Sequence, residues 1–147
     1  MDMKSLVTVP RYGQARDQIA TMLRRADITP THQRVEIAQV LFERQQHLSA
    51  DQIFARVNAR HAETSKATIY NTLKLFLDKQ LVREVIVDPG KVFYDSCTDP
   101  HHHFFDTASG ELTDFPAEGV RIEGLPPLPE GTVADGIDIV IRTRPTP

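Results

Sequence analysis

Three consecutive histidines, His101 to His103, lie in the middle of the chain and make up half of its six histidines. On a β-strand, His101 and His103 project from one face and His102 projects from the other. Such an i, i+2 pair can chelate one Mn, Fe or Zn ion, and an imidazole can also serve as an axial ligand of haem. The pattern therefore predicts a divalent metal site at His101 and His103, with all three histidines as haem candidates. The alternative is a polar strand that binds no ligand.

A single cysteine, Cys97, excludes an internal disulfide and any structural zinc site built from four cysteines. A solitary thiol is typical of the reducing cytoplasm, which is the location that we expect. The apolar runs are far shorter than a membrane span and the N-terminus lacks a signal-peptide pattern, so we expect no membrane partner. Nothing in the sequence resembles a general base beside an open metal position, which argues against an enzyme.

The charged residues are unevenly distributed along the chain. Residues 1–95 contain 14 Lys and Arg against 11 Asp and Glu, a net charge of +3. Residues 96–147 contain three against nine, a net charge of −6. This separation favours a front half that faces a polyanion and an acidic back half with a different task.

Four amphipathic helices are predicted in the first 80 residues. Apolar residues keep helical spacing between Gln14 and Ala26, and Thr31 is a candidate N-cap for a second helix. The segment SADQ, which begins at Ser49, has the form of a capping box that opens a third helix, and Ser65 caps a fourth. The buried stripe of the fourth helix follows the i, i+4, i+7, i+8 rule and consists of Ile69, Leu73, Phe76 and Leu77.

After Leu81 the pattern changes to that of a β-hairpin. The segment LVREVIV is β-branched, Pro89-Gly90 favours a tight turn, and KVFYD supplies the return strand. Helices followed by a hairpin predict a winged helix-turn-helix domain in residues 1–95. Residues 96–147 form a second, small domain, in which GIDIVIRTR predicts a strand with Ile137, Ile139 and Ile141 on one apolar face. A second copy of the chain would cover that face.

The fourth helix has the features of a DNA-recognition helix. With its apolar stripe turned inward, five residues remain outside near its N-terminal end: Lys66, Thr68, Tyr70, Asn71 and Lys74. In a helix-turn-helix this end enters the major groove, where Lys suits phosphate, Asn pairs with adenine, and a Tyr ring or Thr methyl contacts thymine. A solvated helix face is the alternative, but the hairpin with Lys91 at its tip favours DNA.

Four segments in order carry a resemblance to a known family: TPTHQRVEIAQVLF, HLSADQIF, SKATIYNTLKLFLDKQLV and HHHFFD. They resemble the ferric uptake regulator (Fur) superfamily, and are most similar to its iron response regulator (Irr) branch. The resemblance covers about residues 18 to 144. It implies an α+β fold with an N-terminal winged helix, a small C-terminal α/β dimerisation domain, and a homodimer that binds palindromic double-stranded operator DNA. Besides the outer face of the fourth helix, the residues assigned to DNA binding are Arg24, Arg25, Arg34, Ser65 and Lys91.

The resemblance also implies a regulatory metal site between the two domains. The family uses a His before the third helix, a carboxylate in the hairpin, a His-x-His and a carboxylate on the next strand. Here these positions resemble His47, Asp88, His101 with His103, and Asp114. Imidazole with carboxylate suits Mn, Fe or Zn. Taken alone, His47 would more often be a surface or capping residue, and an aspartate before Pro-Gly is typical of a turn.

Three features depart from the family pattern. Asp106 and Ser109 stand where many Fur-type regulators carry the first Cys-x-x-Cys pair of a structural zinc site. Pro100 occupies one ligand position of the family's second metal site. Cys97 is followed by Thr98, so the Cys-Pro haem motif of some Irr proteins is absent.

The sequence therefore predicts a transcription regulator of iron or haem homeostasis that responds to a metal ion or to haem. One alternative within the superfamily is a peroxide-sensing regulator, because Asp114 resembles that branch as well. An alternative from another class is a metal-binding enzyme or metal-storage module, which would bind no specific DNA sequence.

Overall fold

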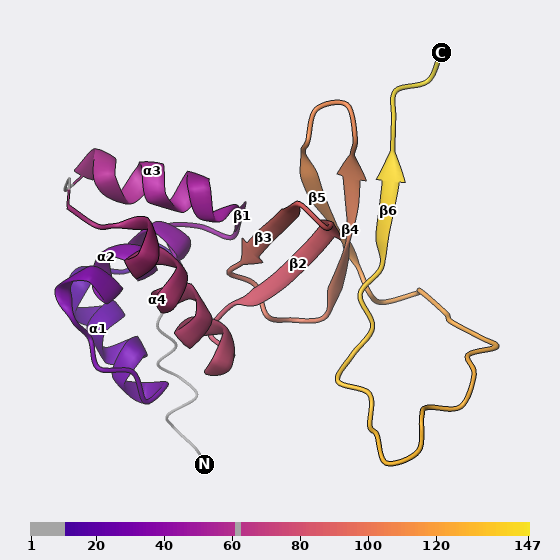
Figure 1. The fold of residues 1–147 in the computed structure, drawn as a ribbon, viewed down its shortest axis with the longest axis horizontal. Helices are drawn as coiled ribbons and strands as arrows, with labels where there is room; N and C mark the ends of the chain where they lie inside the picture. The colour runs from indigo at the N-terminus through magenta and orange to yellow at the C-terminus, as the bar shows by residue number, and fades with distance from the viewer. Residues whose placement is uncertain (1–10, 61–62) are drawn as a thin grey trace, which may run out of the picture. The chain divides into compact units, whose positions relative to one another are not determined.

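A computed structural model describes residues 11–60 and 63–147. The chain divides into two compact units, Met1–Thr98 and Asp99–Pro147. Helices and a small sheet form the first unit, and a second small sheet forms the other (Figure 1). This is the α+β fold class that the sequence predicts, with the division after Thr98 rather than after Asp95.

The four predicted helices are present in the first unit. Their bounds are α1 (Arg16–Arg25), α2 (His32–Leu41), α3 (Ala50–Arg60) and α4 (Lys66–Asp78). The predicted caps are present as well, with Thr31 as the N-cap of α2. Ser49 and Gln52 form the reciprocal capping box of α3, with bonds of 2.9 and 3.1 Å. The Ser65 hydroxyl accepts the Thr68 N–H of α4 at 3.1 Å. Local capping therefore sets where α2, α3 and α4 begin.

The helices enclose one hydrophobic core. Its fully buried side chains come from all four helices and include Ile19, Leu23, Ile37, Leu41, Phe42, Ile53, Val57, Ile69, Leu73 and Phe76. The buried stripe of α4 packs into this core, so the opposite side of that helix must face outward. The core therefore holds α4 in one orientation.

The predicted hairpin is confirmed, and it gains a third strand. Strands β2 (Arg83–Asp88) and β3 (Lys91–Asp95) pair antiparallel, and the short β1 (His47–Leu48) pairs with the free edge of β3. The Asp88 carboxylate accepts the Gly90 N–H at 2.9 Å and closes the turn. The sheet therefore brings His47 opposite Asp95, across nearly 50 residues of chain.

The chain leaving β3 is tied to the helical part through Ser96. Its carbonyl accepts the Arg11 Nε–H at 2.9 Å and the Tyr12 hydroxyl at 3.3 Å. Its N–H donates to the carbonyl of Gln46 at 3.2 Å. Ser96 itself is fully buried. These bonds explain why the first unit continues beyond Asp95.

The second unit is a three-stranded sheet. Its strands are β4 (His101–Asp106), β5 (Leu112–Pro116) and β6 (Val140–Thr143), in the order β5-β4-β6. Strand β4 pairs antiparallel with β5 and parallel with β6. The C-terminal strand is shorter than predicted, and the Ile139 N–H just before it donates to the His102 ring at 3.2 Å. Ile137 and Ile141 are 50% and 42% exposed.

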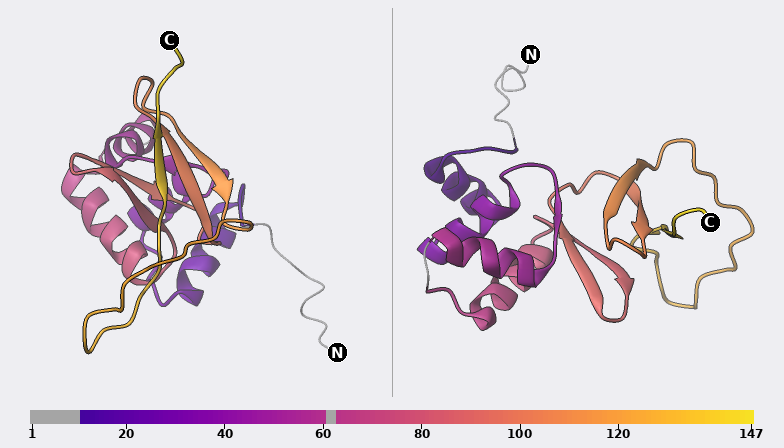
Figure 2. Two further views of the ribbon diagram at one scale, coloured as in Figure 1. Left: turned by 90° about the vertical axis from the view of Figure 1, so that its right-hand side faces the viewer. Right: turned by 90° about the horizontal axis from the view of Figure 1, so that it is seen from above.

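Residues 117–139, between β5 and β6, form a long loop without helix or strand (Figure 2). The structure describes every residue from 99 to 147, and none of them is helical. The second unit is thus built from strands alone, although the resemblance implies a mixed α/β domain. Pro126, Pro127 and Pro129 stand in the middle of this loop, and proline within a helix removes a hydrogen bond and clashes with the preceding turn.

Candidate metal centre and nucleic-acid interface

Helix α4 presents the polar face that the sequence predicts for DNA binding. Tyr70 is 52% exposed, and Asn71 and Lys74 are exposed beside it. Ser65 and Thr68 are engaged in the N-cap, where the Ser65 hydroxyl also donates to the Thr68 hydroxyl at 3.0 Å. Tyr70, Asn71 and Lys74 are therefore open to a partner on this face.

Lys66, in the first turn of α4, lies close to helix α3. Its ammonium is 3.6 Å from the Asp51 carboxylate and 5.5 Å from the centre of the Phe54 ring. Both charged side chains are well exposed, at 63% and 80%. An ion pair this exposed is weak, so Lys66 can exchange Asp51 for a DNA phosphate at little cost.

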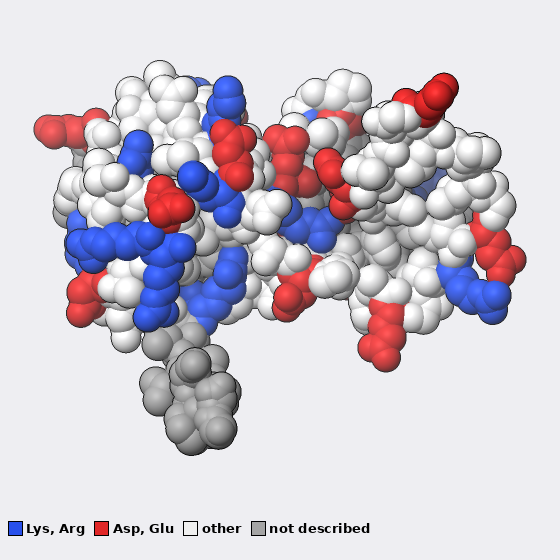
Figure 3. Space-filling model, turned by 90° about the horizontal axis from the view of Figure 1, so that it is seen from below, with Lys and Arg blue, Asp and Glu red and all other residues white. Residues whose placement is uncertain are grey.

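The remaining cations predicted to bind DNA also belong to the first unit. Arg24 and Arg25 are exposed in the last turn of α1, and Lys91 is exposed beside the hairpin turn. Arg34 lies in the first turn of α2 and donates to the carbonyl of Thr29 at 2.9 Å. Figure 3 shows Lys and Arg side chains gathered over this unit. The positive charge inferred from the sequence is thus carried by exposed side chains of the helical unit.

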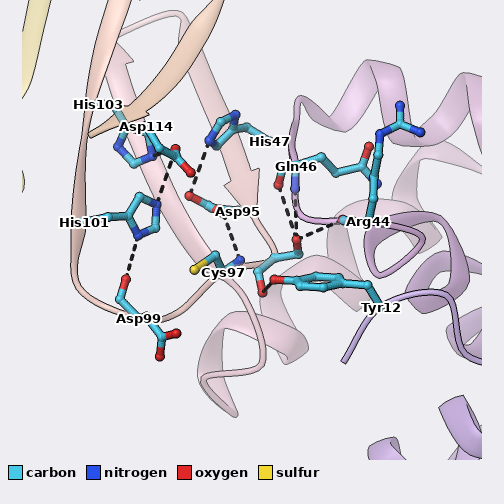
Figure 4. A network of polar contacts seen from close by, with 11 residues as sticks. Tyr12, Arg44, Gln46, His47, Asp95, Cys97, Asp99, His101, His103 and Asp114 are labelled. Carbon is cyan, nitrogen blue, oxygen red and sulfur yellow. Dashed lines mark hydrogen bonds and ion pairs between the residues drawn. The ribbon is translucent and has the colours of Figure 1, made fainter. Parts of the chain in front are cut away.

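In the first unit, a histidine and a buried carboxylate form one candidate ligand pair. His47 Nε2 lies 3.7 Å from Asp95 Oδ2 (Figure 4). The other oxygen of Asp95 accepts the Cys97 N–H at 2.9 Å, which orients the carboxylate. Imidazole and carboxylate together suit divalent first-row metals. The pair can therefore contribute two ligands to an ion.

The family resemblance implied Asp88 as the carboxylate that accompanies His47. In the structure, the carboxylate beside His47 is that of Asp95. Asp88 ends β2 at the turn, where it pairs with Lys91 and binds the Gly90 N–H. At the usual strand rise of 3.3 Å per residue, the turn lies roughly 13 Å along the hairpin from Asp95. The two-residue β1 carries no readable pattern, so its pairing with β3 was not predicted. The one signal for Asp95 was its place as the last residue of KVFYD.

In the second unit, two histidines converge on one carboxylate. The Nε2 atoms of His103 and His101 lie 3.2 and 3.6 Å from Asp114 Oδ1 (Figure 4). His103 and Asp114 face each other in the β4–β5 register. The rings of His101 and His103 are 4.6 Å apart on the same face of β4, as period-two geometry predicts.

The hydrogen bond at the other nitrogen of His101 indicates which atom can bind a metal. Nδ1 lies 2.6 Å from the carbonyl oxygen of Asp99, which can only accept, so Nδ1 carries the proton. In the neutral ring, Nε2 then carries a lone pair that lies near the Asp114 carboxylate. Two acceptors this close need a proton or a metal ion between them, and a carbonyl that orients a ligand histidine is the usual arrangement at metal sites.

His102 has the opposite arrangement. Its Nδ1 accepts the Ile139 N–H at 3.2 Å, so the lone pair of Nδ1 is used and the proton is on Nε2. Its ring packs against Phe115, with a centroid distance of 5.5 Å. No ring lone pair is left for the iron of haem. The geometry therefore does not favour His102 as the axial ligand that the sequence suggested.

The turn between β4 and β5 takes the place of the Cys-x-x-Cys pair. The Asp106 carboxylate accepts the N–H groups of Ala108 and Ser109 at 2.9 and 3.3 Å. These bonds lower the pKa of Asp106 below its ordinary value, and the bond from Ala108 has the larger effect. A carboxylate cap thus closes this turn without zinc.

Residues 11–124 match the model of the ferric uptake regulator family, more than half of the chain. The chain belongs to the ferric uptake regulator family. Members of this family are transcription regulators and not enzymes. Among the described residues, no helix has both the length and the apolar character needed to cross a membrane.

Curated relatives match over part of their length. The peroxide-responsive repressor PerR of Staphylococcus epidermidis is 32% identical over 93 residues, which are 63% of this chain and 62% of that protein. PerR of Staphylococcus aureus is 33% identical over 93 residues, 63% of each protein. The match thus spans less than two thirds of these relatives. Both are peroxide-responsive repressors, so the closer similarity to the Irr branch stays a prediction.

Solved structures of the family share the fold. The ferric uptake regulator of Pseudomonas aeruginosa, solved with manganese, has a TM-score of 0.64 at 21% identity and covers 86% of this chain and 97% of that one. The regulator of Vibrio cholerae has a TM-score of 0.66 at 20% identity and covers 85% and 98%. At these identities the likeness concerns the fold alone.

Proposed function

We propose that this protein is a metal-responsive transcription regulator of iron homeostasis that binds palindromic operator DNA as a cytoplasmic homodimer. The observation that carries the proposal is the convergence of His101, His103 and Asp114, in a chain that also contains a winged helix. Family membership supports both parts of the proposal. The exposed apolar side chains Phe104 and Ile141 on the second sheet support a second copy as their cover.

The donor set fits a divalent ion. Two ligands bonded to one ion at about 2.0–2.2 Å lie at most roughly 4.4 Å apart. The separations of 3.2 and 3.6 Å between the histidine nitrogens and Asp114 meet this condition. The oriented Nε2 of His101 adds a ligand whose lone pair is already placed. Bound there, a divalent ion would neutralise the carboxylate and link the three side chains.

We propose further that His47 and Asp95 complete the ligand set from the first unit. His101 and His103 with Asp114 supply three ligands, and five suit the coordination that Fe and Mn favour. Asp95 and His101 are six residues apart, so the chain between them spans at most roughly 20 Å. Because His47 and Asp95 belong to the same unit as α4, a full ligand set would restrict how α4 is presented to DNA. Metal binding and DNA binding would then be coupled.

A second candidate is peroxide sensing through the same residues. The curated relatives named above are peroxide-responsive repressors, and the carboxylate beside the two histidines is an aspartate. In this version, Fe(II) at the site would lead peroxide to add an oxygen atom to a nearby histidine ring. The modified ring would bind metal poorly, and the coupling to DNA would be lost. Mn(II) would not support the modification.

One experiment tests both versions. Duplexes that bind the Mn-loaded chain are selected from a random-sequence pool, and their affinity is measured for apo, Mn-loaded, Fe-loaded and haem-treated protein. We expect Mn and Fe to change the affinity by at least about tenfold, the scale of an ordinary allosteric coupling, and haem to have little effect. Peroxide treatment of the Fe-loaded chain, followed by peptide mass analysis, distinguishes the two candidates. Equal affinity in all four states would contradict metal control.

A further inference from the structure

A groove of about 440 Å³ lies between the N-terminal end of α2 and one side of α4. Its polar lining consists of Thr31, Gln33 and Arg34 from α2, and of Thr68, Asn71 and Thr72 from α4. An arginine is the one charged side chain in this lining, and none of the described residues there is acidic. The groove is therefore suited to an anion.

The first turns of the helices show the same preference. Helices α1 and α3 carry Asp17 and Asp51 in their first turns, where a carboxylate offsets the positive end of the helix dipole. The first turns of α2 and α4 contain no acidic residue. The two helices that line the groove are thus the two whose positive ends lack a carboxylate of their own.

The hydroxyl of a largely buried threonine provides an independent sign of a ligand. Thr72 is only 5% exposed, and it lines the groove. Its hydroxyl forms no hydrogen bond with any residue in the part of the chain that the structure describes. Its oxygen is not among the fully buried side-chain atoms without a partner, so a molecule in the groove can reach it. The Thr72 side chain is therefore placed to donate to a molecule in the groove.

We propose that this groove receives a phosphate of the DNA backbone when α4 enters the major groove. At 100° per residue, Tyr70 and Lys74 project outward from α4, whereas Thr68 and Thr72 lie on the flank that faces α2. A recognition helix has base edges in front of it and a phosphate strand along each flank. The groove lies on such a flank. This inference rests on the proposed DNA-binding function.

The proposal assigns new roles to particular residues. The Gln33 amide, the Arg34 guanidinium and the hydroxyl of Thr72 donate to phosphate oxygens, with the end of the α2 dipole behind them. These contacts carry no sequence information, but they set the register of α4 on the duplex. Asn71, between the outward face and the groove, is left to read a base edge. Thr68 then belongs to the phosphate contact and not to base reading.

The test places a carboxylate in the groove with little change in size. Gln33→Glu is compared with Gln18→Glu, the same change in the first turn of α1. Both side chains are exposed, and a glutamate at position 18 can still accept the Ala15 N–H. An acidic residue in a first helical turn favours folding, so loss of structure would not explain a loss of binding. Affinity is measured with the Mn-loaded chain on the selected duplex and on a scrambled duplex.

We expect Gln33→Glu to weaken binding to both duplexes by at least about tenfold, since a hydrogen bond to a charged group is removed and a like charge is added. Gln18→Glu should stay within about twofold of the wild type, as is usual for a surface change. A further variant, Arg34→Gln, should lower the slope of log affinity against log salt by about 0.9 for each phosphate that the protein no longer neutralises.

The outcomes separate the proposal from the function on which it rests. If the wild type selects no duplex, both are wrong. If the wild type binds and Gln33→Glu binds equally well, only the phosphate contact is wrong. A loss confined to the selected duplex would show that Gln33 reads bases, which also overturns the proposal.

Discussion

The two units of the chain bury their apolar side chains to very different extents. In the first unit, a continuous core joins all four helices and the sheet, from Ile19 to Tyr94. In the second, Phe105 and Leu112 are the buried apolar residues. That unit instead exposes Phe104, Val120, Ile122, Leu125, Leu128, Val133, Ile137 and Ile141. The contrast indicates that the first unit has a core of its own, whereas the second relies on something added to it.

In the second unit, polar side chains occupy buried positions that apolar residues would fill in an ordinary core. His101, His102 and His103 are buried along one strand, and two of them converge on Asp114. A sheet of about 50 residues with such an interior has little hydrophobic stabilisation. In our proposal, a bound ion and a second copy of the chain supply the stabilisation that this sheet lacks. The less stable unit is thus also the one that holds three of the proposed metal ligands.

The largest expected effect comes from removing a ring in each unit. Phe76→Ala should lower the free energy of unfolding by about 3–5 kcal/mol, because it opens a cavity in the first core. The matched change Phe104→Ala, at a ring that is 38% exposed, should cost less than about 1 kcal/mol. Urea unfolding of both variants, at a protein concentration low enough to keep the chain monomeric, measures the difference. Equal losses in the monomer would contradict the contrast between the units.

Substitutions on the two faces of β4 should differ in their effect on metal affinity. His103→Ala removes a direct ligand and should reduce Mn affinity by more than about 100-fold, since changes beyond the first ligands alone cost 10–100-fold. His102→Ala should leave the affinity within about threefold, because its ring binds the Ile139 N–H and faces away from Asp114. Isothermal titration with Mn(II) measures both. Similar losses in the two variants would contradict the assignment of the strand faces.

The smallest expected effect concerns the backbone. Every residue with positive φ in the second unit is a glycine, but the first unit places Asp27 and Gln80 in this region, at φ 61° and 59°. Gln80 follows the C-cap of α4 in a left-handed conformation, and the Leu81 N–H donates to the carbonyl of Phe76 at 2.8 Å. Gln80→Gly should raise the free energy of unfolding by about 0.5–1 kcal/mol. Glycine removes the strain of a side chain at positive φ in the folded state, and this gain exceeds the entropy that glycine adds to the unfolded chain.

Thermal unfolding of Gln80→Gly beside Lys74→Gly, at an exposed position inside α4, checks this prediction. The second variant should lose about 1 kcal/mol, because glycine is a poor helix former. Loss of stability in both would show that Gln80 makes a contact that outweighs its backbone strain.

Most of the first unit could be predicted from the sequence, because its elements are specified by residues close together in the chain. The caps at Thr31, Ser49 and Ser65 and the Pro89-Gly90 turn each act within a few residues. The period of the apolar residues then decided which face of α4 turns inward. In the second unit, the alternation of side chains along a strand separated His101 and His103 from His102.

Other features were decided only by the tertiary structure. The carboxylate beside His47 is that of Asp95, because a two-residue strand pairs segments nearly 50 residues apart. The lone pair of His102 is used by the N–H of Ile139, 37 residues away. The groove beside α4 exists because the packing of the core brings the start of α2 against it. No local pattern specifies such pairs, since each depends on how distant segments pack and on which backbone groups are then left to be bonded.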